Sequence, residues 1–329
     1  MSASSLPPAP ARMSSPAWGL YRGALLQGPD TPRHIVAALR RKRWLYVGVC
    51  AKESVLGAAV ADLGFAANAF AYVGPLDGRP ARQWKVVAAP WQVRVDRRSA
   101  QWRSGAQELS IALPEGANPG RLRASLRGAD GPIDLDVALT TTAPDAAVTC
   151  VAPARPGAAD RWNLTTKDNT LRAKGTARWG ADALDLDAAA VIDVTDAYPA
   201  RRMVWNWASL AGSDDRGRAV GVNLCALHND SELARENVAW LDGAPHALGP
   251  VRFAFDRGAR ERAPWTITGD GVDLRFTPAG ARGGDENLVV VVSKFTQPYG
   301  RFSGTVRAGA DTVRLDGVAG VVEDHEALW

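Results

Sequence analysis

The densest group of acid–base side chains in this sequence lies near its C-terminal end, in Glu323-Asp324-His325-Glu326. If a β-strand runs through these residues, Glu323 and His325 share one face, because successive side chains of a strand point to opposite faces. A carboxylate beside an imidazole can orient the ring or exchange a proton with it. Glu323 and His325 are therefore candidate catalytic residues, although a solvated chain end explains the same residues equally well.

Glu236 is a third catalytic candidate. Glu236-Asn237 directly precedes the apolar segment Val238-Ala239-Trp240, so one of the two polar side chains is expected to face inward. A glutamate buried near tryptophans has a raised pKa and can act as a general acid, and Asn237 could bind a polar group of a ligand. Most glutamates are solvated, so a surface position for Glu236 is the competing interpretation.

Two pairs of aromatic residues have the spacing of neighbours on one strand face, Trp205 with Trp207 and Trp44 with Tyr46. Such pairs form flat apolar walls whose indole N–H groups need acceptors. These walls can line a ligand cavity or belong to a packed core, and the core is the commoner use. We treat all four residues as candidate ligand-binding residues.

A further candidate is Asn223, which shares a strand face with Gly221 and Cys225. Glycine beside asparagine predicts either a close approach of another backbone or a carboxamide that points into a polar pocket. A structural hydrogen bond between strands is the alternative for Asn223.

The elements that must position these side chains are β-strands. Apolar and polar residues alternate over Ile133–Leu139, Leu171–Arg178, Val251–Phe255 and Val272–Phe276, and turn signals such as Gly269-Asp270-Gly271 separate many of the strand-like segments. Closely spaced strands without long amphipathic helices predict an all-β protein of antiparallel sheets in barrels or sandwiches. Helix is expected only at Pro32–Arg41 and as one turn after Asp187.

The composition changes once, at the Pro/Ala/Gly-rich stretch 152–159, which is the best candidate linker. We expect a disordered tail over residues 1–17, an N-terminal β-barrel domain over 18–152, and a C-terminal β-barrel domain over 160–329 that carries the candidate site. Each half is long enough for about eight to ten strands, enough to close a barrel.

Charge and hydropathy exclude several classes of protein. The 39 basic and 35 acidic residues leave a net charge of only +4, and the basic run Arg40-Arg41-Lys42-Arg43 is not interleaved with aromatic residues, so no nucleic-acid partner is expected. No apolar run approaches the roughly 20 residues of a membrane-spanning helix, which leaves peripheral membrane contact open. The N-terminal segment has no apolar core of a signal peptide, so a cytoplasmic location is expected.

Familiar cofactor and metal motifs are absent from the sequence. It contains no GxGxxG opening a helix, no GxxxxGK[ST], no HExxH and no GxSxG. The three cysteines, Cys50, Cys150 and Cys225, are far apart and suit small core residues better than disulfides or zinc ligands. We therefore expect no cofactor and no metal ion. The sequence carries no signal for the oligomeric state.

Several short motifs in a consistent order resemble the DUF2804 family, over roughly residues 20–329. These motifs are Arg43-Trp44-Leu45-Tyr46, Trp205-Asn206-Trp207, Gly221-Val222-Asn223-Leu224, Glu236-Asn237 and Gly320-Val321-Val322-Glu323-Asp324-His325. That family is distantly similar to lipocalin-like two-barrel proteins such as carotenoid 1,2-hydratase and pericyclase-like enzymes. The resemblance implies a calycin-like pair of β-barrels, an apolar lipid or isoprenoid-like ligand and no redox cofactor. It transfers no catalytic residues, because the hydratase motif does not align with this chain.

The sequence thus favours a lipocalin-like protein with an apolar cavity. If it is an enzyme, we expect a cofactor-independent hydratase (a lyase) or isomerase. Protonated Glu236 or Glu323 would donate to a double bond, His325 would be the proton partner, and aromatic faces would stabilise positive charge. The alternatives are a non-catalytic binder or carrier of lipids or other apolar molecules, and a scaffold with filled barrels.

Overall fold

The computed structural model describes residues 6–25, 27–29, 35–129, 131–155, 161–287 and 292–328, and within these ranges nearly every regular element is a β-strand. The described helices are the short α1 (Ile35–Arg40) and the 3-10 turn η1 (Pro90–Gln92). α1 confirms the helix expected near Pro32–Arg41, of which residues 32–34 lie outside the described residues. The turn of helix expected after Asp187 is wrong, because a long strand, β13 (Asp182–Ala197), continues through it. No helix in the described ranges has the length and apolar character needed to cross a membrane.

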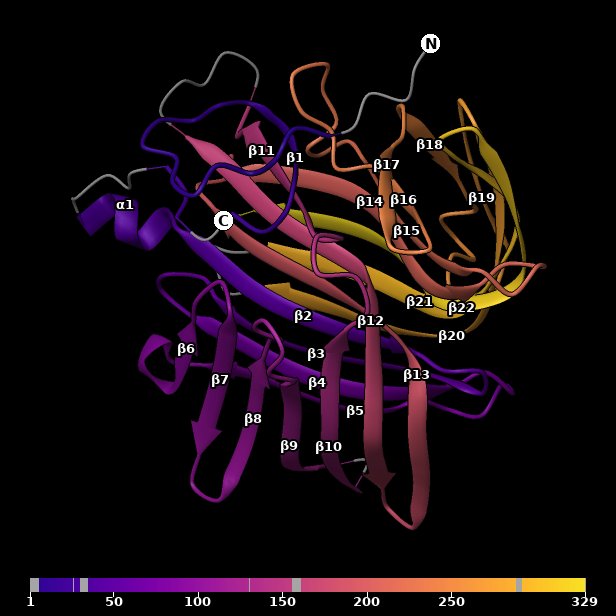
Figure 1. The fold of residues 1–329 in the computed structure, drawn as a ribbon. Helices are drawn as coiled ribbons and strands as arrows, with labels where there is room; N and C mark the ends of the chain where they lie inside the picture. Colours follow the sequence, from indigo (N-terminus) through magenta and orange to yellow (C-terminus); the bar gives the residue numbers. More distant parts are fainter. Residues whose placement is uncertain are drawn as a thin grey trace.

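The first sheet contains thirteen described strands, and its order brings late strands beside early ones (Figure 1). Its main path is β5 (Arg82–Ala88), β4 (Ala67–Pro75), β3 (Ser54–Asp62), β2 (Lys42–Cys50), β13, β12 (Trp162–Trp179), β10 (Gly131–Thr141), β9 (Gly120–Gly128), β8 (Gln107–Ala112), β7 (Ser99–Ser104) and β6 (Val93–Val95), with β11 (Val148–Pro153) beside β12 and β1 (Gly19–Arg22) beside β11. The sheet curls into a nearly closed barrel.

The second sheet contains nine described strands and curls into a half-barrel. Its order is β17 (Ala244–Ala247), β16 (Val238–Leu241), β15 (Ala219–Ala226), β14 (Arg202–Ser213), β22 (Asp311–Leu328), β21 (Val292–Ala308), β20 (Val272–Asn287), β19 (Trp265–Gly269) and β18 (Val251–Ala254). The described ladders of both sheets are antiparallel. The all-β class and the lipocalin-like pair of curled sheets are confirmed.

Alternation explains how each sheet fills its own interior. In β10 the apolar set Ile133, Leu135, Val137 and Leu139 is buried, while Asp136 between them is exposed. Such side chains from many strands form one large apolar cluster inside the first sheet, and a second cluster fills the second sheet in the same way. The inner faces of both sheets are therefore packed, and the expected site must lie elsewhere.

The change from one sheet to the other falls between Ala197 and Arg202. The stretch expected as a linker, 152–159, instead begins with the last two residues of β11 and precedes β12, a strand that pairs with β11 within the first sheet. Its residues 156–159 lie outside the described residues. The reason is that β13 pairs with β2, which closes the first sheet with strands from the middle of the chain. The chain thus passes from the first sheet to the second later in the sequence than the expected boundary.

The N-terminal segment also differs from the expected disordered tail. Ala9 and Met13 donate backbone hydrogen bonds to Arg22 and Gln27, and Met13 is buried beside Leu25 in a small apolar cluster. Residues 1–5 lie outside the described residues. A proline- and serine-rich composition predicted disorder, but apolar contacts with β11 and β12 hold residues 6–17 in place.

The outer face of the first sheet packs against the second sheet. Tyr46, Tyr72 and Val191 of the first sheet contact Trp207 and Tyr299 of the second in a shared apolar cluster. The candidate residues meet in this layer between the two sheets.

One polar contact fixes how closely the two sheets approach. Asn169 of β12 donates its amide hydrogens to Ser209 Oγ at 2.9 Å and to the carbonyl oxygens of Leu210 and Val222 at 3.1 and 2.8 Å. A Cβ atom at Gly221 would lie 2.5 Å from the Asn169 carbonyl oxygen, so only glycine fits there. The close backbone approach predicted at Gly221 is confirmed.

Candidate active site

The candidate residues gather around a pocket of about 200 Å³ between the two sheets. Its wall is rich in aromatic side chains from both sheets: Trp44, Tyr46, Phe70, Trp205, Trp207 and Phe295. Polar and ionisable groups interrupt this apolar wall in two places. A concave, mostly apolar site with a few convergent polar groups is the usual form of a small-molecule site.

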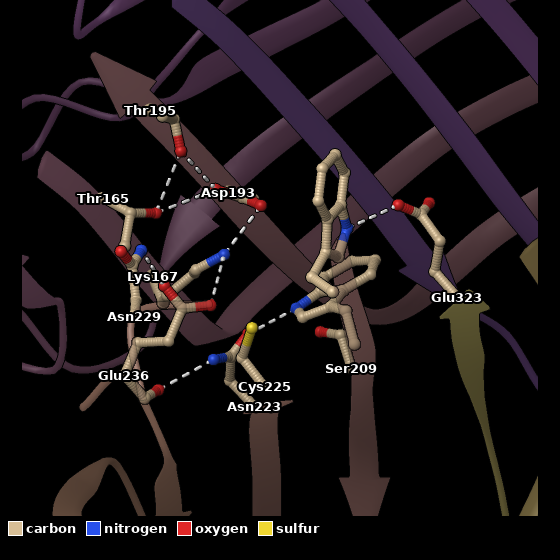
Figure 2. A network of polar contacts seen from close by, with 12 residues as sticks. Thr165, Lys167, Asp193, Thr195, Ser209, Asn223, Cys225, Asn229, Glu236 and Glu323 are labelled. Atoms are coloured by element: carbon tan, nitrogen blue, oxygen red, sulfur yellow. Dashed lines mark hydrogen bonds and ion pairs between the residues drawn. The ribbon is translucent and has the colours of Figure 1, made fainter. Parts of the chain in front are cut away.

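The first polar group, the lysine cluster, consists of Lys167 on β12, Asp193 on β13, and Glu236 just before β16. The Lys167 ammonium lies 2.7 Å from an Asp193 carboxylate oxygen and 3.6 Å from a Glu236 carboxylate oxygen. Lys167 and Asp193 are direct partners in the β12–β13 ladder, so strand register brings this ion pair together. Thr165 and Thr195 complete the shell by donating to Asp193 Oδ1 at 3.1 and 3.2 Å, as Figure 2 shows.

The charges of the lysine cluster do not balance. One ammonium faces two carboxyl groups, so one negative charge remains unpaired when both are ionised. Burial raises the pKa of Glu236, and the negative Asp193 adds to this, while Lys167 and a 2.9 Å hydrogen bond from Asn229 oppose it. Burial would lower the pKa of Lys167, but Asp193 and Glu236 outweigh it and raise that pKa. The surroundings of Glu236 therefore favour its protonated form.

Two neighbours of the lysine cluster stay neutral. Burial and the nearby Lys167 charge lower the pKa of His228 to about 4. Burial and the adjacent Glu236 raise the pKa of the Cys225 thiol well above its ordinary value, and its Sγ donates to the His228 carbonyl oxygen at 3.2 Å. At neutral pH this side of the pocket thus contains a neutral imidazole and a protonated thiol.

The second polar group, the histidine cluster, consists of Glu323 and His325 on β22 and Ser293 on β21. His325 Nδ1 lies 3.1 Å from Glu323 Oε1, and its Nε2 lies 2.9 Å from Ser293 Oγ. Trp205 and Phe295 are the partners of His325 on the two adjacent strands, and their rings lie 3.9 and 5.4 Å from the imidazole, centre to centre. The aromatic contacts and the hydrogen bond with the Glu323 carboxylate together fix the orientation of the imidazole ring.

Glu323 remains ionised in this setting. Its Oε1 accepts from the Trp205 indole at 2.9 Å, and its Oε2 accepts from Gln297 Nε2 at 2.7 Å. Burial alone would raise the pKa of Glu323, but the hydrogen bond and charge of His325, with the charge of Arg282, outweigh burial and lower it. The arrangement therefore places an ionised carboxylate behind an imidazole in the pocket wall.

Arg282 adds a buried cation beside the histidine cluster. Its guanidinium carbon lies 3.6 Å from the centre of the Phe70 ring and 4.8 Å from that of Phe295, and its Nε donates to Gln297 Oε1 at 2.8 Å. Contact with aromatic faces stabilises a cation in a desolvated site. This part of the wall is suited to an oxygen-bearing end of a ligand.

Seven of the nine residues singled out from the sequence line the pocket: Trp44, Tyr46, Trp205, Trp207, Glu236, Glu323 and His325. The other two support the wall from behind. Asn223 accepts from the Trp207 indole at 2.8 Å and donates to the Glu236 carbonyl oxygen at 2.8 Å. Asn237 accepts from the Cys225 backbone N–H at 2.6 Å and donates to the Gly249 carbonyl oxygen at 3.0 Å. Both carboxamides therefore join strands and loops, the structural alternative stated for Asn223.

Sequence reasoning missed several pocket residues: Lys167, Asp193, His228, Arg282, Ser293 and Gln297. One signal for Lys167 was present. The run Thr165-Thr166-Lys167-Asp168-Asn169-Thr170 interrupts a strand with six polar residues in succession, which a half-solvated strand does not need. Within the described ranges, no three His, Cys, Asp or Glu side chains are grouped to hold a metal ion.

Two curled antiparallel sheets packed around an aromatic pocket define a lipocalin-like β-protein. A family model matches residues 17–329, and the chain belongs to that family, described as a domain of unknown function, DUF2804. No curated protein matches the chain.

Several solved structures share the fold. A protein from Nitrosomonas europaea that is described as an AttH superposes on this chain with a TM-score of 0.55 at 15% identity. The superposition covers 86% of this chain and 92% of that protein. Kievitone hydratase from Nectria haematococca gives a TM-score of 0.51 at 15% identity, covering 86% of this chain and 88% of its own. At this identity the similarity establishes the fold.

Proposed function

We propose that the chain is a cofactor-independent lyase or isomerase that transfers protons on a largely apolar substrate held between the two sheets. The observation that carries the proposal is a pair of buried carboxyl groups, Glu236 and Glu323, which line one pocket and have pKa values shifted in opposite directions. Separation of two carboxyl pKa values by their surroundings is how one site supplies both an acid and a base.

Glu236 is assigned as the proton donor. Glu236 retains its proton because the Lys167 ammonium is already paired with the Asp193 carboxylate at 2.7 Å. The Glu236 carboxyl group lies farther from the same ammonium, at 3.6 Å. Donation to a carbon–carbon double bond creates positive charge on the substrate, which the π faces of the surrounding indoles stabilise by about 0.5–2 kcal/mol each. Once Glu236 has lost its proton, Lys167 stabilises the resulting carboxylate.

His325 and Glu323 are assigned as the base. Ionised Glu323 orients the imidazole through Nδ1, which leaves Nε2 to take a proton from water for hydration or from the substrate for isomerisation. Hydration is the preferred reaction, and one structural neighbour bears the name of a hydratase, in keeping with it. The aromatic wall favours an apolar lipid or isoprenoid-like substrate.

The test is incubation of the protein with a total lipid extract in H₂¹⁸O, followed by mass spectrometry of the recovered molecules. We expect a bound molecule to change by the mass of one labelled water for hydration, or to change structure at constant mass for isomerisation. Glu236→Gln should lower the rate by about 10²–10⁴-fold and retain binding. Glu232→Gln, an exposed change four residues earlier, is the matched control.

Two results would contradict the proposal. Unchanged turnover in Glu236→Gln would remove Glu236 as the acid. A molecule that the wild-type protein binds tightly and returns chemically unchanged would instead indicate a carrier, for which the same aromatic wall would suffice.

A further inference from the structure

The histidine cluster contains a hydroxyl group that proton transfer on an alkene does not require. Ser293 lies in the pocket wall, and its Oγ is 2.9 Å from His325 Nε2. On the other side of the same ring, Nδ1 is 3.1 Å from Glu323 Oε1. A hydroxyl, an imidazole and a carboxylate in this order, each within hydrogen-bonding distance of the next, are the working parts of a nucleophilic serine.

The contacts of Glu323 determine which nitrogen of His325 holds the proton. An ionised carboxylate only accepts hydrogen bonds, so Nδ1 must be the donor towards Glu323. In its neutral form the ring then presents the lone pair of Nε2 to the Ser293 hydroxyl. This is the tautomer that removes a proton from serine.

From this arrangement we infer that Ser293 is a nucleophile, and that the pocket also catalyses acyl transfer from esters with apolar acyl chains to water. Ser293 Oγ forms a bond to the ester carbonyl carbon while its proton moves to His325 Nε2. The bond from that carbon to the alcohol oxygen then breaks, and the alcohol leaves with the proton from Nε2. Water, deprotonated by the same nitrogen, hydrolyses the acyl-serine and restores the hydroxyl.

Two features of the surroundings suit this chemistry. Phe295 stands two residues from Ser293 on β21, and its ring contacts the imidazole, so an apolar acyl chain would lie against an existing aromatic surface. Lys85 Nζ lies 3.4 Å from the point that a Cβ atom would occupy at Gly284, the β20 partner of Phe295. Lys85 also lines the pocket, so its ammonium adds positive charge to the wall beside Phe295, of the sign that stabilises a developing oxyanion.

The inference does not depend on Glu236, so it and the proposed function can fail separately. The test is reaction of the full chain with a long-chain alkyl fluorophosphonate, in which Oγ bonds to phosphorus, fluoride leaves and the proton goes to His325. We expect one adduct by intact-mass spectrometry, mapped to Ser293 by peptide sequencing. Ser293→Ala should abolish it, and His325→Gln should slow it by about 10²–10⁴-fold.

Ser303→Ala is the matched control, since Ser303 lies on the same strand and its hydroxyl accepts a backbone hydrogen bond from Gly317 at 3.2 Å. It should be modified like the wild type. Failure of the wild-type protein to form an adduct, or an adduct mapped to another residue, would overturn the assignment. Because mapping is done on the wild type, the result stands even if a variant folds poorly.

Discussion

Glu236 and Glu323 are nearly equally buried in the wall of one pocket, with 3% and 8% of their surfaces exposed, yet their pKa values move in opposite directions. Burial pushes both upwards. Glu323 overcomes it because the hydrogen bond and charge of His325, the charge of Arg282 and the hydrogen bond from Trp205 all favour the ionised carboxylate. Glu236 shares the Lys167 ammonium with Asp193, which lies closer to it. The hydrogen-bonding and charged partners of each carboxyl group, and not its degree of burial, decide the direction in which its pKa moves.

The two clusters also differ in how the chain assembles them. Glu323 and His325 are two residues apart on one strand, so local alternation suffices to place them together. Lys167, Asp193 and Glu236 come from two strands of the first sheet and a loop of the second. The lysine cluster therefore exists only when the two sheets are docked, which ties its chemistry to the interface between them.

The largest expected effect comes from Lys167→Met, which leaves two buried carboxyl groups without their cation. Loss of one partner from a buried ion pair costs about 3–5 kcal/mol of the free energy of unfolding. Chemical denaturation at pH 7 measures it. Lys174→Met, an exposed change on the same strand, should stay within about 0.5 kcal/mol.

A second substitution sharpens this result. Adding Glu236→Gln to Lys167→Met removes the surplus carboxyl group, so part of the lost stability should return. If the double variant is as unstable as the sum of the two single variants, Lys167 and Glu236 are not coupled, and the explanation given for the raised pKa of Glu236 fails.

The sequence predicted the sheets well where one sheet face meets water. In β20, Val272, Leu274 and Phe276 are buried while Asp273 and Arg275 between them are exposed, as alternation requires. The same rule does not predict the burial of β12, where residues 162–169 are buried on both faces. Polar residues there resemble a solvated face, because nothing local shows that a second sheet will cover it.

The candidate site was predictable in proportion to how local its contacts are. The shared faces of Glu323 with His325 and of Trp205 with Trp207 follow from spacing alone, and all four residues line the pocket. Ser293 reaches His325 only through the β21–β22 register, which spacing within one strand cannot reveal. Asn223 and Asn237 are buried, but the direction of a carboxamide depends on distant partners that the sequence does not name.

The pH dependence of the free energy of unfolding should distinguish the contributions of Glu323 and Glu236. The folded-state pKa of Glu323 is lowered, so its contribution is present above the unfolded pKa of about 4.3 and is lost as the pH falls through the folded value. The folded-state pKa of Glu236 is raised, so its contribution is present below about 4.3 and is lost as the pH rises through the folded value. Each difference changes by at most about 1.4 kcal/mol per pH unit.

The measurement is the free energy of unfolding of the wild type minus that of Glu323→Gln, and separately minus that of Glu236→Gln, from pH 3 to 8. The first difference should shrink towards acid pH, and the second should shrink towards neutral pH. Glu232→Gln, in an exposed position, provides the flat reference. Two differences with the same sign of slope would remove the contrast on which the acid and base assignments depend.

The smallest expected effect isolates a single hydrogen bond to Glu323. Trp205→Phe keeps an aromatic ring beside His325 but removes the indole N–H that lies 2.9 Å from Glu323 Oε1. We expect a loss of about 1 kcal/mol of stability and a rise in the pKa of Glu323, measured by carboxyl ¹³C NMR titration. Trp207→Phe is the control, because its indole donates to Asn223 and should leave the pKa of Glu323 unchanged. An equal rise in both variants would show that the aromatic packing, and not the indole hydrogen bond, keeps Glu323 ionised.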